Sequence, residues 1–201
     1  MTNEELEIEE WRREDREQSA YHEACHFVMN ILVGSAIPRR ITIEANEAAG
    51  YSGFCGGDAW CDAGEVLRGM AGVFAEGVIG HGWLRDAGDE EEIEKALTAL
   101  YGADWEAHWR GYYDFTWKVL SYRSAQNAIW LVSQRLNETG SFAMEAVYPL
   151  LDDAERALGN RRKWLCKKVD TFMREKMRET NSNATPSGMA LPASQSLVGE
   201  V

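Results

Sequence analysis

The pentapeptide His22-Glu23-Ala24-Cys25-His26 contains the side chains best suited to chemistry in this sequence. Two histidines four residues apart project from one face of a helix, so their ring nitrogens can bind a single Zn²⁺ ion. The intervening Glu23 would lie beside the open coordination position, where it can accept a proton from the water that attacks a peptide bond. The pattern predicts a catalytic zinc site with His22 and His26 as ligands and Glu23 as general base.

The residues around this motif predict that it lies on a buried helix. Between Ser19 and Val33 apolar residues recur at helical spacing, and Gly34 is a suitable C-terminal stop. Burying two imidazoles and a carboxylate costs free energy unless a partner such as a metal ion satisfies them. The alternative is a chance occurrence of the motif, in which both histidines are hydrogen-bonded core residues.

A catalytic zinc ion needs a third protein ligand, which has to come from another segment. The extended metzincin motif is absent, because Met29 and Leu32 occupy the positions of its glycine and third histidine. Four segments instead resemble, in content and order, the peptidase domain of the FtsH-type AAA zinc metalloproteases. They are AYHEACH at residues 20–26, ITI at 41–43, AGY at 49–51 and AGVFAEG at 71–77, and the resemblance extends over about residues 19–152.

The resemblance also implies a third ligand. The family segment that carries an aspartate ligand aligns without a gap to residues 88–96, which puts Glu92 at the ligand position. Glutamate is one methylene longer than the family's aspartate, a difference that zinc itself accepts. Asp89 and Glu92 also match a capping box at a helix start, in which case Glu92 would not be a ligand. Asp89 and Glu91 are the alternative carboxylates.

The expected fold is α+β and mainly helical, with the HExxH active-site helix, a small antiparallel sheet and then a helical bundle. Alternating residues predict a strand at 41–44, and residues 50–54 can return beside it as a second short strand. Apolar residues at helical spacing predict a helix over 64–80 and another from the acidic turn at 86–92. The second half of the chain reads as entirely helical, with a short helix opening at Phe142.

Charge and composition divide the chain into four parts. Residues 1–18 form a charged N-terminal arm, and residues 19–160 form the peptidase-like domain. Residues 161–179 form a basic amphipathic helix, and the tail at 180–201 is expected to be disordered.

The composition argues against several classes of protein. With 33 acidic and 21 basic residues the net charge is −12, which disfavours nucleic acid and anionic membranes as partners. No stretch approaches the roughly 18–20 apolar residues of a membrane span, and the N-terminus does not read as a signal peptide. Four cysteines without a Cys-x-x-Cys pair predict reduced thiols and a cytoplasmic protein.

These features predict a zinc-dependent metalloendopeptidase acting on unfolded or short peptides, which an extended strand edge would bind through backbone hydrogen bonds. No Walker A motif occurs, so hydrolysis itself would not use ATP, and a separate ATPase would have to unfold folded substrates. The aromatic cluster at 101–122 could serve as core or as the face of a homo-oligomer. The alternative is a non-catalytic protein-binding or assembly module, with the basic helix or this cluster as its contact surface.

Overall fold

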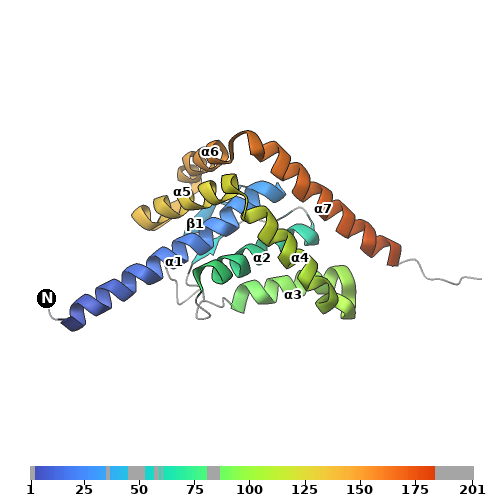
Figure 1. Ribbon diagram of the computed structural model, residues 1–201, viewed down its shortest axis with the longest axis horizontal. Helices are drawn as coiled ribbons and strands as arrows, with labels where there is room; N and C mark the ends of the chain where they lie inside the picture. The colour runs from blue at the N-terminus through green and yellow to red at the C-terminus, as the bar shows by residue number, and fades with distance from the viewer. Residues whose placement is uncertain are drawn as a thin grey trace, which may run out of the picture.

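A computed structural model of the protein describes residues 3–34, 37–44, 53–56, 59, 61–80 and 87–183. The fold is mainly helical with a small three-stranded antiparallel sheet, as predicted (Figure 1). The helices are α1 (Asn3–Val33), α2 (Asp62–Ile79), α3 (Ala87–Tyr101), α4 (Trp105–Leu120), α5 (Arg123–Thr139), α6 (Val147–Leu158) and α7 (Arg162–Asn183). The strands are β1 (Arg40–Thr42), β2 (Phe54–Cys55) and β3 (Ser141–Ala143). Among the described helices, none is both long and apolar enough to cross a membrane.

Helix α1 passes through the body of the fold and has two different halves. From residue 9 to residue 17 every side chain is exposed, and in Figure 1 this part extends beyond the other helices. From Ala20 onward most side chains are buried against α5, α2 and the strands. The charged arm is therefore the first part of a continuous helix. The helix ends at Val33, and Gly34 has a φ of 72°, a left-handed conformation that glycine adopts at little cost, as predicted.

The sheet has the order β2-β1-β3, so β1 lies in the centre. The predicted first strand corresponds to β1, and its partner β2 places Cys55 opposite Ile41. Residues 50–52 of the predicted second strand lie outside the described residues. The interpretation of the second half as entirely helical was wrong, because Phe142 belongs to β3 and pairs with Ile41. A strand formed through a partner about 100 residues away leaves little trace in its local sequence.

Helices α2 and α3 approach each other closely because α2 has glycines at their contact. A Cβ at Gly69 would lie 2.6 Å from the Ile93 Cγ1 atom, and a Cβ at Gly72 would overlap the Asp89 carboxylate. Ile93 is fully buried, so the first turns of α3 are held against α2 by packing as well as by the missing side chains. This contact brings the start of α3 to the histidine motif on α1.

Helix α7 corresponds to the predicted basic amphipathic helix. Leu165, Val169 and Met173 bury its apolar stripe. The helix continues to Asn183, so residues 180–183 are helical and not part of a disordered tail. Residues 184–201 lie outside the described part of the chain.

Candidate metal centre

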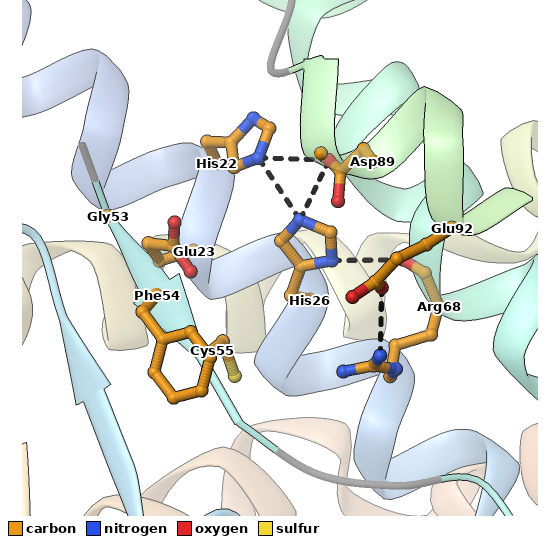
Figure 2. A pocket seen from close by; sticks show the side chains of 10 residues that line it. His22, Glu23, His26, Gly53, Phe54, Cys55, Arg68, Asp89 and Glu92 are labelled. Atoms are coloured by element: carbon orange, nitrogen blue, oxygen red, sulfur yellow. Dashed lines mark hydrogen bonds and ion pairs between the residues drawn. The ribbon is translucent and has the colours of Figure 1, made fainter. Parts of the chain in front are cut away.

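His22, His26 and Asp89 bring three possible metal-ligand atoms together between α1 and the start of α3 (Figure 2). His26 Nε2 lies 3.0 Å from His22 Nε2 and 3.1 Å from Asp89 Oδ2, and His22 Nε2 lies 3.2 Å from the same oxygen. His22 is 6% exposed and His26 is 8% exposed. Within the described residues, these three form the group of side chains that can hold a metal ion.

The separations and the chemistry of the group fit Zn²⁺. Ligands about 2.0–2.1 Å from a tetrahedral ion lie roughly 3.3–3.4 Å from one another. The observed 3.0–3.2 Å therefore requires movements of only a few tenths of an ångström. Two imidazoles and one carboxylate also form the ligand set of a class of catalytic zinc sites.

The backbone orients one of these ligands. His26 Nδ1 lies 2.9 Å from the carbonyl oxygen of Arg68 on α2, so the Nδ1–H group donates to that oxygen. With Nδ1 used in this way, a neutral His26 presents the lone pair of Nε2 to the cluster. Gly72, also on α2, leaves the space that the Asp89 carboxylate and the His22 ring occupy.

The buried charges shift the pKa values of two members of the cluster. Burial, the largest single influence, lowers the pKa of His26, but the charge and hydrogen bond of Asp89 together with the hydrogen bond to the Arg68 carbonyl outweigh it, and the pKa rises above 6.5. Burial by itself raises the pKa of Asp89, but the charges and hydrogen bonds of His26 and His22 hold it well below its usual range. Asp89 is therefore anionic at neutral pH, the form that binds a metal ion.

Glu23 belongs to the same cavity as the cluster. The residue is 4% exposed, and the chain just before β2 passes so close that a Cβ at Gly53 would overlap the Glu23 carboxylate. In Figure 2 this carboxylate lies next to the histidines on the side of β2, where it can exchange a proton with a molecule in the cavity. The cavity has a volume of about 180 Å³ and is lined by His22, Glu23, His26, Gly53, Phe54, Cys55, Arg68, Gly88, Asp89 and Glu92.

The structure brings Asp89 to the two histidines in place of the expected Glu92, which corrects the choice of carboxylate. Glu92 Oε2 instead lies 3.0 Å from Arg68 Nη2, and the Glu92 side chain is 58% exposed. Glu91, the other alternative, is exposed. The physical reason is the close approach of α3 to α2 at Gly72. It puts the first turn of α3 so near His22 that the short side chain of Asp89 reaches the cluster.

Two further residues of the site were not singled out in the sequence. The role of Arg68 depends on its backbone carbonyl and on partners from two segments, so its residue type gives no local signal. Gly72 does give a signal in the sequence, because small residues spaced along a helix indicate a close contact with another helix. That signal predicts the contact but does not say which residue of α3 meets it.

No protein-family model matches this chain, and comparisons with curated proteins and with solved structures found no match. The function therefore has to be argued from the site.

Proposed function

We propose that this protein is a zinc-dependent metallopeptidase that hydrolyses peptide bonds of unfolded or short peptides. The observation that carries the proposal is the triangle of His22, His26 and Asp89 with buried Glu23 in the same cavity. Three protein ligands leave a coordination position open, which is typical of catalytic zinc sites and not of structural ones. The resemblance of residues 20–26 and the segments that follow to the FtsH-type peptidase domain supports the same activity.

Each residue of the site has a part in this proposal. His22, His26 and Asp89 would hold the ion, and the Arg68 carbonyl keeps the His26 ring in its orientation. When bound, Zn²⁺ supplies the Lewis acid that polarises the scissile carbonyl and acidifies a water molecule. Glu23 accepts the proton of the attacking water and returns it to the leaving amine. The low exposure of His22, Glu23 and His26 strengthens their electrostatic interactions.

Strand β2 is the proposed binding edge for the substrate. It lies at the edge of the sheet, and Gly53, Phe54 and Cys55 line the cavity beside Glu23. A peptide that extends the sheet here gains backbone hydrogen bonds whatever its sequence, so specificity should be broad. Strand β1, the other edge considered from the sequence, lies between β2 and β3 and cannot take this part. Folded substrates would need a separate unfolding ATPase.

Zinc loading combined with the Glu23→Gln variant tests the proposal. The wild type should bind about one Zn²⁺ per chain and cleave casein or an unstructured peptide. Glu23→Gln should retain the zinc, because Glu23 is not a ligand, and lose cleavage by roughly 10²–10⁴-fold. Elemental analysis without zinc in the loaded wild type would overturn the proposal. Undiminished cleavage by Glu23→Gln would assign the activity to another site.

A second candidate function, a protein-binding or assembly module without catalysis, is favoured by a groove between α4 and α7. The groove has a volume of about 510 Å³, and Trp164 in its wall is 40% exposed. Aromatic rings and lysines together suit contact with an acidic protein segment. Stoichiometric zinc together with peptide cleavage separates the two functions. The groove residues are Phe115, Lys118, Trp164, Lys167, Lys168, Thr171, Phe172 and Glu175.

A further inference from the structure

Two carboxylates of α3 face the same cavity but have different partners. Asp89 and Glu92 are three residues apart on one helix, so their Cβ atoms are separated by about 5–6 Å. Both line the cavity. Asp89 is one corner of the ligand triangle, whereas Glu92 turns towards Arg68 (Figure 2). Because a glutamate side chain spans most of that separation, Glu92 is a potential fourth ligand for an ion held by the triangle.

Arg68 is a fixed cation at the wall of this cavity. Its Nε atom donates to Glu65 Oε2 at 2.8 Å, and the other oxygen of Glu65 accepts the backbone N–H of Ala59. Burial lowers the pKa of Arg68, but Glu65 and Glu92 outweigh this and raise it, so the guanidinium stays charged. One arm of a guanidinium held in this way binds Glu92 Oε2.

The contact between Arg68 and Glu92 does little for stability. The Glu92 side chain is more than half exposed, and ion pairs open to solvent contribute little to the free energy of unfolding. The direction in which the pair holds Glu92 is therefore the more important consequence. The pair holds Glu92 outside the group of His22, His26 and Asp89, whose ligand atoms all lie within 4.8 Å of one another, and Figure 2 shows the Glu92 carboxylate bonded to Arg68.

We propose that Arg68 holds Glu92 away from the zinc ion and thereby keeps open the coordination position that hydrolysis needs. This inference rests on the proposed function. A site with two histidines, Asp89 and Glu92 as ligands would be closed, like a structural zinc site, and would have no place for water or substrate. Arg68 is then a positioning residue that acts through Glu92.

Three variants and a control test the inference. Arg68→Gln frees Glu92, so zinc should bind at least roughly tenfold more tightly in competition with a chelator, and peptide cleavage should fall by at least about tenfold. Arg68→Gln combined with Glu92→Gln should reverse both changes, because the amide does not replace water on zinc. Glu92→Gln by itself should still bind zinc. The matched control is Arg156→Gln, which removes the 2.9 Å ion pair with Asp153 on α6 and should alter neither property.

A measurement on the wild type covers the case in which Arg68→Gln does not fold. Salt weakens an exposed ion pair, so raising the ionic strength should tighten zinc binding and slow cleavage in the wild type. Glu92→Gln should show a smaller salt dependence of both. Equal salt dependence in the two proteins would overturn the inference.

The results separate this inference from the proposed function. If Arg68→Gln weakens zinc binding or leaves it unchanged while the wild type binds zinc and cleaves peptides, the inference fails and the proposed function stands. A double variant as impaired as Arg68→Gln also overturns the inference, because it would assign a structural role to Arg68. If the loaded wild type holds no zinc, both fail together.

Discussion

The cavity beside α1 and the groove between α4 and α7 differ in how their polar groups are arranged. In the cavity, imidazoles and carboxylates from α1 and α3 converge on one another and are mostly buried. In the groove, lysines extend along aromatic rings, as Lys168 Nζ does 5.1 Å from the centre of the Trp164 ring. Phe115 and Phe172 stack there with their ring centres 3.9 Å apart.

The difference supports the proposal that the cavity, and not the groove, performs chemistry. Burying titratable groups costs free energy unless each is matched by a partner, and the cavity brings several such groups together. The groove has no comparable cost, because its lysines lie on apolar surface with their charged ends near solvent. In the cavity His22, His26 and Asp89 are matched by one another in an arrangement that could also hold a metal ion, whereas the groove is explained by packing or by contact with a partner.

The largest expected effect is the loss of zinc in Asp89→Asn. This variant keeps the shape of the side chain but removes the anionic ligand, so zinc affinity should fall by more than the roughly 10–100-fold expected for a residue that only supports a ligand. Glu92→Gln is the matched control, because it removes a carboxylate from the same helix face and cavity. Chelator competition measures both. Zinc lost from Glu92→Gln and retained by Asp89→Asn would return Glu92 to the ligand position.

Gly72→Ala should disturb the cavity without changing any of its polar groups. The added Cβ overlaps the Asp89 carboxylate, so Asp89 must move, and zinc affinity should fall roughly 10-fold or more. Overpacking should also lower the free energy of unfolding by about 1–3 kcal/mol. Gly111 on α4 is the control, since a Cβ there meets nothing within 4 Å. Gly111→Ala should stabilise the protein by up to about 1 kcal/mol. Equal effects of the two variants in thermal melts would contradict the packing argument.

A smaller effect is expected on the pH dependence of the stability of the metal-free protein. The lowered pKa of Asp89 stabilises the fold above about pH 4, and this contribution is lost as the pH falls through the folded-state pKa. The raised pKa of His26 stabilises the fold below about pH 6.5, and this contribution is lost as the pH rises through the folded-state pKa. The wild type should therefore exceed His26→Gln in melting temperature most clearly between about pH 4 and 6.5. A difference that grows above pH 8 would contradict the ion pair.

The smallest effect is expected from the groove. Lys168→Glu should leave zinc binding and peptide cleavage unchanged, and its effect on the free energy of unfolding should stay within about 0.5 kcal/mol, as for most surface changes. Zinc titration, a cleavage assay and a denaturant melt measure the three quantities. A large loss of cleavage would mean that substrate contacts the groove. The contrast between the cavity and the groove would then no longer hold.

The local sequence was sufficient for features that depend on neighbouring residues. The spacing of His22, Glu23 and His26 determines which helix face each side chain occupies, because an α-helix repeats every 3.6 residues. The apolar spacing likewise predicted α2 and the buried stripe of α3. The position of β1 was predicted from alternation, but its second partner, β3, was not, since β3 depends on a pairing between Phe142 and Ile41.

The identity of the third possible metal ligand was decided by tertiary structure. Asp89, Glu91 and Glu92 are all carboxylates at the start of one helix, and their residue types do not distinguish them. The distinction arises because Gly72 lets α3 approach His22 at its first turn, where the shorter Asp89 fits and Glu92 meets Arg68. Such a contact depends on how the two helices pack against each other, which the residue types of the carboxylates do not determine. A motif within one helix carries its own geometry, whereas a site shared between helices takes its geometry from their packing.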